Sequence, residues 1–270
     1  MQRSGSLYTL GFAGAVCVMC AVVVSSSAYF LRAPQERNKL LDRQRQILSV
    51  AGLLESGTVL PPGEVRKLFD DSVEKAFVNL KTGKALTSDE FRSETGLDPA
   101  TYDAREASTK SEFGRDAPEG NLARIPRLAN YEIVYYIREE GQISEIILPI
   151  NGKGLWSTLY GFLALDKDTR TVRGITFYEH GETAGLGGEI ENPKWKALWK
   201  GRLVYDENWI PDITVIKGQA GPPEADPHEV DGLSGATITS RGVSNLVRFW
   251  LGEDGFKLFL EQFRNQGSAA

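Results

Sequence analysis

The first pattern along the chain is an apolar run near its N-terminus. From Leu7 to Leu31 no side chain is charged, and most side chains are apolar or small. About 20 residues of helix cross the hydrocarbon core of a bilayer, so this run is long enough to be a membrane anchor. A cleaved signal peptide is the competing interpretation, because Arg3 precedes the run and residues 26–28 (Ser-Ser-Ala) suit a cleavage site. The length of the run favours the anchor.

The charges on either side of the run leave its orientation open. Only Arg3 precedes it, whereas several basic residues follow it between Arg32 and Arg45. The positive-inside rule, applied to these charges, would keep the rest of the chain in the cytoplasm, but the rule weakens for long translocated domains.

Amphipathic patterns come next. Residues 35–54 predict a stalk helix, which Gly57 and the Pro61-Pro62 pair should end. Residues 64–77 have apolar side chains at helical spacing and predict a second amphipathic helix. The polar stretch 82–127 has little periodicity, so we expect long surface loops with one short helix.

From Tyr131 onward the pattern becomes that of strands. Segments rich in β-branched and aromatic residues predict one hairpin from Tyr131–Ile137 and Ile143–Ile150, and another from Gly161–Leu165 and Thr171–Tyr178. Connections this short require antiparallel pairing. The predicted fold class is therefore α+β, with a mainly antiparallel sheet and packed helices, preceded by one N-terminal transmembrane helix.

Two further elements follow the hairpins. Asn192 and Pro193 begin a short helix, as an N-cap residue and a first-turn proline, with Trp195 and Trp199 on one face. Residues 213–216 predict another strand.

Composition and charge narrow the class of protein. The chain has 270 residues, of which 41% are hydrophobic and 25% charged, as in globular proteins. A net charge of −5 argues against a partner that is a nucleic acid. The chain has only two cysteines, Cys17 and Cys20, both in the apolar run, so a four-thiolate zinc site within one chain and a disulfide scaffold are excluded.

The stretch with the most chemical information is a glycine-containing, hydroxyl-rich loop from Asp231 to Ser240. Apolar residues at helical spacing follow it, so Thr239 or Ser240 should lie at a helix N-terminus. Free backbone N–H groups and the helix dipole stabilise an anion there, and Arg241 adds a nearby cation. Ordinary capping by Ser or Thr explains the same pattern equally well. The loop lacks the Gly-Lys-Ser/Thr end of a P-loop.

This loop resembles the flavinylation motif of the FMN-binding domain that occurs in the C subunit of the sodium-translocating NADH:quinone reductase and in the G subunit of the related Rnf complex. The motif reads roughly Asp-x-x-Ser/Thr-Gly-Ala-Ser/Thr-x-Ser/Thr. In it, the last hydroxyl residue, which is Thr239 here, is esterified to the FMN phosphate. The other loop residues that the resemblance places at the cofactor are Ser234, Gly235, Ala236, Thr237, Ser240 and Arg241.

Two further segments, 154–165 and 177–190, resemble the quinone reductase version of this domain, except that Ala184 stands where the family usually has proline. The resemblance implies flavin stacking near Trp156, Glu182, Thr183 and Leu186. From the residues alone, Trp156 more often belongs to a hydrophobic core, and Glu182 to a solvated acidic edge together with Glu179 and Glu189.

The resemblance to the quinone reductase family implies a covalently flavinylated electron carrier in a sodium-pumping NADH:quinone oxidoreductase, passing electrons from NADH via other subunits toward ubiquinone. It implies a single-pass protein of the bacterial inner membrane with a periplasmic main domain, other subunits as partners, and a flavin transferase for maturation. Three alternatives remain: an Rnf-type subunit, a non-redox membrane-anchored scaffold, and a secreted enzyme with a phosphate ligand. The expected divisions are a cytoplasmic N-terminus (1–6), a transmembrane helix (7–31), a stalk helix and linker (32–60), a periplasmic helical and loop region (61–130) and an FMN-binding domain (131–264).

Overall fold

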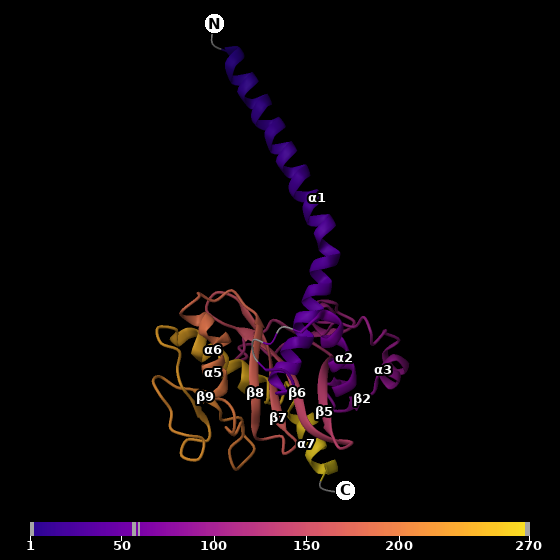
Figure 1. Cartoon of the computed structure of the whole chain (residues 1–270), viewed down its shortest axis with the longest axis vertical. Helices are drawn as coiled ribbons and strands as arrows, with labels where there is room; N and C mark the ends of the chain where they lie inside the picture. The colour runs from indigo at the N-terminus through magenta and orange to yellow at the C-terminus, as the bar shows by residue number, and fades with distance from the viewer. Residues whose placement is uncertain (1–2, 56–57, 59, 268–270) are drawn as a thin grey trace. The chain divides into compact units, whose positions relative to one another are not determined.

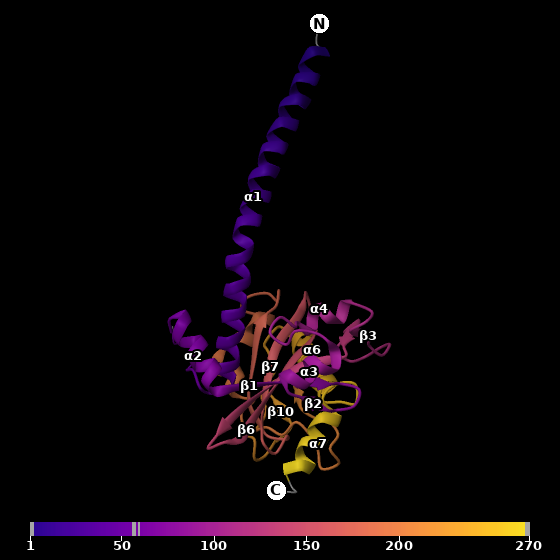
Figure 2. The same cartoon turned by 90° about the vertical axis from the view of Figure 1, so that its right-hand side faces the viewer.

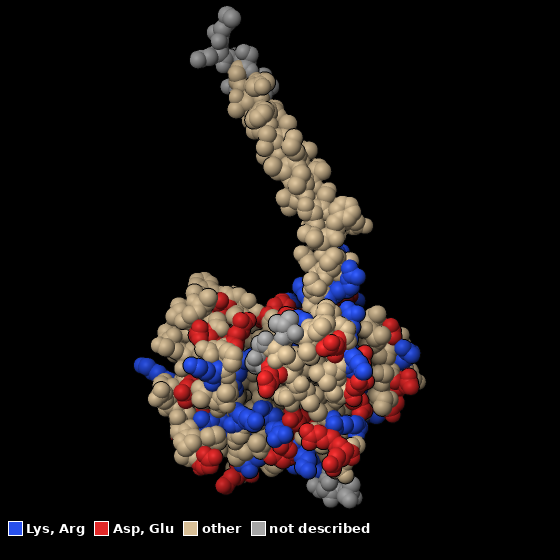
Figure 3. Space-filling model, in the orientation of Figure 1, with Lys and Arg blue, Asp and Glu red and all other residues tan. Residues whose placement is uncertain are grey.

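The computed structural model describes residues 3–55, 58 and 60–267, which form two compact units that divide between Arg43 and Gln44. The anchor and the predicted stalk are one continuous helix, α1 (Arg3–Val50), with Pro34 inside it (Figure 1). Among the described residues, this is the one helix long and apolar enough to cross a membrane. Among the side chains that Figure 3 draws in colour, none along the outer part of this helix is charged, whereas both signs of charge are interspersed over the globular unit.

Helix α1 ends earlier than the sequence predicted. Its last residue is Val50, and Gly52 follows with φ of +70°, a left-handed conformation that suits glycine and stops the helix. Gly57, the expected stop, lies outside the described residues.

The globular unit is built on a six-stranded antiparallel sheet, so the predicted fold class and both predicted hairpins are confirmed (Figures 1 and 2). Across the sheet the strands are β2 (Ala85–Leu86), β1 (Val73–Asn79), β5 (Tyr131–Glu139), β6 (Gln142–Lys153), β7 (Thr158–Asp166) and β8 (Val172–Glu179).

The predicted helix over 64–77 is wrong in its second half. Helix α2 covers only Pro62–Ser72, and the chain then enters β1, which pairs along its whole length with β5. Both faces of β1 are covered: Ala76 and Val78 belong to the main core, and Phe77 stacks on Phe91 of a smaller cluster. Because a strand buried on both faces has apolar residues at consecutive positions, the short apolar run matched helical spacing as well.

The stretch 82–127 holds more regular structure than the single short helix expected. It contains α3 (Ser88–Thr95), α4 (Ala104–Thr109) and β3 (Gly114–Asp116), which pairs with β4 (Arg127–Ala129). A capping box between Thr87 and Glu90 begins α3. This Thr-x-x-Glu signal is visible in the sequence.

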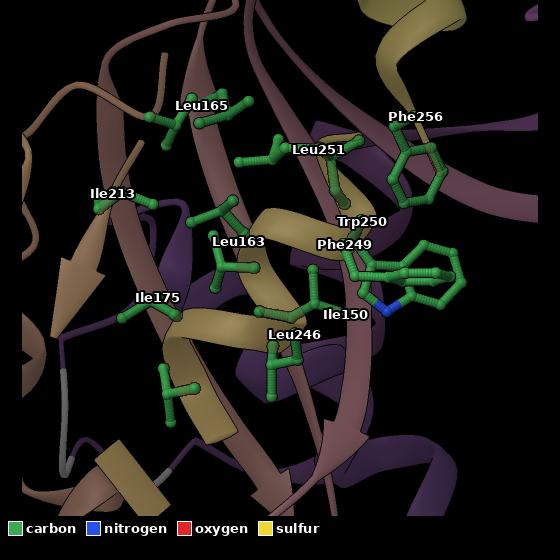
Figure 4. Packing of buried hydrophobic residues seen from close by; sticks show 14 of the residues in the cluster. Ile150, Leu163, Leu165, Ile175, Ile213, Leu246, Phe249, Trp250, Leu251 and Phe256 are labelled. Atoms are coloured by element: carbon green, nitrogen blue, oxygen red, sulfur yellow. The ribbon is translucent and has the colours of Figure 1, made fainter. Parts of the chain in front are cut away.

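One face of the sheet is covered by α6 (Thr237–Trp250), and Figure 4 shows Leu246, Phe249 and Trp250 of α6 among Ile150, Leu163 and Ile175 of the strands. Trp250 also donates its Nε1–H to the carbonyl of Asn151 at 2.7 Å. Each fully buried side chain of this size contributes about 1.5–3 kcal/mol.

The remaining helices and strands of the globular unit are η1 (Gly187–Glu191), α5 (Pro193–Ala197), β9 (Thr214–Val215), β10 (Glu229–Val230) and α7 (Lys257–Gly267). The predicted cap is confirmed, since Asn192 accepts from the Lys194 N–H. The predicted strand over 213–216 is β9, which pairs parallel with β10.

Candidate functional site

Three segments that are far apart in the sequence meet at one pair of side chains. These segments are the turn between β6 and β7, the loop between β8 and η1, and the first turn of α6. The hydroxyl of Thr239 on α6 donates a hydrogen bond to Oε2 of Glu182 in the β8–η1 loop, at 2.5 Å. The other carboxylate oxygen, Oε1, accepts from the backbone N–H groups of Trp156 (2.9 Å) and Ser157 (3.3 Å) in the β6–β7 turn. One carboxylate therefore joins all three segments.

Close backbone packing makes this meeting possible. A Cβ at Gly242 on α6 would lie 2.7 Å from the carbonyl oxygen of Lys153, and one at Gly152 on β6 would lie 2.5 Å from the Cβ of Leu246. With no side chain at either position, α6 lies against the end of β6. Its first turn is thereby placed beside the β6–β7 turn.

Glu182 is a buried group, so its interpretation as part of a solvated acidic edge is wrong. Glu182 is only 9% exposed. Burial by itself raises the pKa of this carboxyl, but the hydrogen bonds from Thr239 and from three backbone N–H groups outweigh that effect and lower the pKa below its ordinary value. The carboxylate is therefore ionised at neutral pH.

The two other acids grouped with Glu182 have different surroundings. Glu179 pairs with Arg105 at 3.0 Å, with both side chains about half exposed, and Glu189 accepts from the side-chain amide of Asn192 at 2.7 Å. His180 lies closer to the site, where its Nδ1 accepts from the Glu182 N–H at 3.2 Å.

Hydroxyl groups do not cap α6, although capping was the alternative explanation of the loop. The N-cap residue is Ala236, and no side chain caps the helix. Ser240 instead accepts from the Leu233 N–H, and Thr237 is exposed. The first-turn N–H groups of α6 are thus available to an anion.

The three segments that meet at the Glu182–Thr239 pair also carry exposed apolar side chains. Trp156 is 67% exposed, which overturns its interpretation as a core aromatic residue. Leu155, Leu186 and Ile238 from the same three segments are each between 42% and 54% exposed. Leu155 and Ile238 are additions to the predicted set, and Ile238 occupies the variable position between the two threonines of the motif.

The other predicted residues lie on the same three segments, and most of them are exposed to solvent. Ser234, Thr183 and Arg241 are exposed, and Gly235 has φ of +71°, a conformation that favours glycine. In the part of the chain that the structure describes, no three metal-binding side chains gather into a group.

An FMN group fits these features of the chain. The uncapped N-terminus of α6 suits a phosphate, and the exposed apolar side chains on the same segments suit a ring system. A family model described as "FMN-binding domain" matches residues 154–252, which contain all three segments. The fold and the site thus define the class of this chain, a protein with an FMN-binding domain.

Proteins with similar sequences identify the family of FMN-binding proteins to which the chain belongs. The chain is 46% identical to the C subunit of the Na(+)-translocating NADH-quinone reductase of Yersinia pestis over 251 residues, which are 92% of this chain and 90% of that protein. It is 45% identical to the corresponding protein of Pseudomonas aeruginosa over 265 residues, which are 97% and 98% of the two chains. The chain belongs to the NqrC family, the C subunits of the Na(+)-translocating NADH-quinone reductase.

Solved structures agree with this assignment. The crystal structure of Shewanella oneidensis NqrC superposes with a TM-score of 0.73 at 34% identity and covers 86% of this chain and 99% of that one. The corresponding protein from Parabacteroides distasonis gives a TM-score of 0.62 at 27% identity, with 85% and 96% covered.

Proposed function

We propose that the hydroxyl of Thr239 carries FMN through a phosphoester, and that the chain serves as a covalently flavinylated electron carrier. The observation that carries this proposal is the position of that hydroxyl, which lies in the uncapped first turn of α6 where the three segments meet. A phosphodiester keeps one negative charge, which suits a helix N-terminus. When bound, the isoalloxazine ring supplies the electron transfer.

The chain's own residues would hold the group in two ways. Backbone N–H groups of Thr237, Ile238 and Thr239, in the first turn of α6, would face the phosphate, with Ser234, Gly235, Ala236, Ser240 and Arg241 around them. The exposed apolar side chains would shield the ring, together with Glu182 and Thr183. The residues assigned to this shielding role are Leu155, Trp156, Leu186 and Ile238.

The family gives the setting of this carrier. We infer that it passes electrons from NADH via other subunits toward ubiquinone, coupled to sodium export, in a bacterial inner membrane. Residues 7–31 would span the membrane once, 1–6 would be cytoplasmic, and 32–60 would form the stalk and linker. The regions 61–130 and 131–264 would be periplasmic, with the latter as the FMN-binding domain. A flavin transferase would attach the cofactor.

The experiment that tests the attachment is in-gel flavin fluorescence of the denatured full-length chain, made in a host that has a flavin transferase. We expect a fluorescent band for the native sequence and for Thr237→Ala, and none for Thr239→Ala. Intact-mass analysis should show one FMN less one water on the two fluorescent proteins.

Two outcomes would contradict the proposal. An unmodified native chain would favour the non-redox scaffold, and fluorescence retained in Thr239→Ala would move the acceptor to another hydroxyl. The Rnf-type alternative is disfavoured, because relatives at 45–46% identity over more than nine tenths of the chain are C subunits of the quinone reductase.

A further inference from the structure

A hollow of about 460 Å³ lies where the end of α1 and helix α5 meet β8, the edge strand of the sheet. Helix α5 lies beside this strand (Figure 1). The volume falls within the range of about 300–1,000 Å³ that is common for small-molecule sites. The described residues that line the hollow belong to α1 and the turn after it, to β5, β6 and β8, and to α5 and the turn after it. The hollow is therefore distinct from the three segments that meet at Thr239.

The wall formed by α1 and β8 is held by specific contacts. The Thr176 hydroxyl on β8 donates to the side-chain oxygen of Gln46 on α1 at 2.7 Å. A Cβ at Gly174 would lie 2.8 Å from the carbonyl oxygen of Val50, so the end of α1 lies against β8 at a position where the strand has no side chain. This wall of the hollow is therefore well defined.

The strand side of the hollow has more negative than positive charge. Glu145 on β6 accepts from Nε of Arg173 on β8 at 3.0 Å, and Asp166 lies 3.6 Å from the same guanidinium. Glu139, exposed at the end of β5, is a third carboxylate that acts on Arg173. Burial raises the pKa of Glu145 against the effect of Arg173, and the other two carboxylates add to the rise. Among the described residues, one guanidinium thus faces three carboxylates, and Oε2 of Glu145 is buried without a hydrogen-bond partner.

The α5 side of the hollow has two ammonium groups. Lys196 is half-buried, and burial lowers the pKa of its ammonium. Its Nζ donates one long hydrogen bond, to the Thr176 hydroxyl at 3.4 Å. Glu191, the acid whose charge acts on Lys196, lies 2.9 Å from Nε2 of His180. Lys200 is exposed and lines the same hollow.

The two sides do not neutralise each other. Within the part of the chain that the structure describes, neither lysine is in ion-pair contact with a carboxylate, although both signs of charge line one hollow. Exposed apolar side chains of Leu53, Pro193 and Ala197 complete the lining. A ligand that satisfies both sides needs an anionic group for the lysines and a cationic group for the carboxylates.

We propose that this hollow binds a small zwitterion that carries a phosphate and an ammonium group, with the phosphate at Lys196 and Lys200 and the ammonium group at the carboxylate side near Glu139. A phosphate monoester has about −1.5 to −2 charges at neutral pH, which matches two lysines. Lysine binds phosphate as a compact point charge, whereas the planar fork of Arg173 is already occupied by carboxylates. The same chemistry occurs in free aminoalkyl phosphates and in the head groups of zwitterionic lipids.

The test uses O-phosphoethanolamine as the probe and the full-length chain in a non-ionic detergent, in a buffer without phosphate. Calorimetric titration should show one saturable site. Glycerol 1-phosphate lacks the ammonium group and ethanolamine lacks the phosphate, so each should bind about tenfold more weakly than the probe or worse. Dihexanoyl phosphatidylethanolamine, below its micellar concentration, distinguishes the two sources: tighter binding than the probe assigns the site to a lipid head group, and weaker binding to a free phosphate.

Three variants locate the binding. Lys196→Gln should weaken the probe about tenfold. Glu139→Gln should weaken the probe about two- to fivefold, as expected for an exposed pair, and should leave glycerol 1-phosphate bound no more weakly. Lys194→Gln removes the same charge as Lys196→Gln from an exposed position of α5 outside the lining, and it is the matched control that should bind as the native chain does.

A measurement on the native chain does not depend on how the variants fold. Acylation by an N-hydroxysuccinimide ester, mapped by peptide mass analysis, should be slowed at Lys196 by the probe and unchanged at Lys194.

The inference would be overturned if the native chain bound no O-phosphoethanolamine, if glycerol 1-phosphate bound as tightly as the probe, or if Lys194→Gln weakened binding as much as Lys196→Gln. Equal protection of both lysines from acylation would also contradict it. These measurements need no covalent flavin, so their failure leaves the proposed function standing.

Discussion

Gly187 packs its α-carbon directly against the hydroxyl of Thr239, and a methyl group built on Gly187 would lie 2.6 Å from Oγ1 and 2.8 Å from Oε2 of Glu182. The two residues are far apart in the sequence, yet the absence of a side chain at one gives the other its hydrogen bond. The glycine therefore belongs to the site as much as the hydroxyl does.

Gly187→Ala should disrupt the Glu182–Thr239 pair and lower the rate of covalent flavin attachment. Overpacking of this kind costs about 1–3 kcal/mol, which corresponds to a loss of roughly 5- to 160-fold in rate if it falls on the reactive geometry. The same gel fluorescence assay measures it. Gly63→Ala, which has open space around the added methyl group, is the control and should behave as the native chain does.

Trp156→Ala should leave the fold unchanged and alter the cofactor. Because the side chain is 67% exposed, the free energy of unfolding of the unmodified chain should stay within about 0.5 kcal/mol. The absorption spectrum and midpoint potential of the loaded chain should shift, because the ring loses an apolar neighbour.

Trp199→Ala is the contrasting variant, because Trp199 is 0% exposed. This substitution should lower the free energy of unfolding, measured by urea titration, by about 3–5 kcal/mol. Equal destabilisation by the two substitutions would show that Trp156 is a packing residue after all.

Arg241→Glu should slow flavin attachment by placing a negative charge near the proposed phosphate position in α6. The defect should shrink as salt is raised, because an exposed charge is screened. Lys194→Glu makes the same change of net charge at an exposed position of α5. If both variants were slowed alike, the effect would reflect overall charge and Arg241 would have no local role.

Glu132 on β5 should make the stability of the globular unit depend on pH. Burial, reinforced by the nearby charge of Asp103, raises the pKa of Glu132 to about 8, whereas its ordinary value is 4.5. Between these values the native state binds a proton that the unfolded state has lost, so the free energy of unfolding contributed by this group decreases as pH rises from about 4.5 to about 8.

Glu132→Gln should flatten this dependence, with a gain over the native chain at pH 9 of roughly 5 kcal/mol at most. Denaturant titrations at pH 5, 7 and 9 measure the difference. Parallel pH profiles for the two chains would mean that Glu132 is not buried as an uncharged acid.

The accuracy of the sequence predictions varied with how local the signals were. The two hairpins and the cap at Asn192 were predicted correctly, because alternation and capping act between residues close in the chain. Residues 73–77 were assigned to a helix because a strand buried on both faces has no alternation to reveal it. The sequence predicted one short helix within 82–127 without a position, although the Thr87–Glu90 capping box marks the start of α3.

The sequence by itself determined the apolar segment, the antiparallel sheet, the family and the hydroxyl-rich loop with Thr239, since each depends on a contiguous pattern or motif. Only the tertiary structure decided that Glu182 is buried against Thr239 and that Trp156 is exposed. Those facts arise where α6 lies against β6 and two loops close around its first turn. Burial and hydrogen bonding between residues so far apart are properties of packing, and no spacing within a single segment contains them.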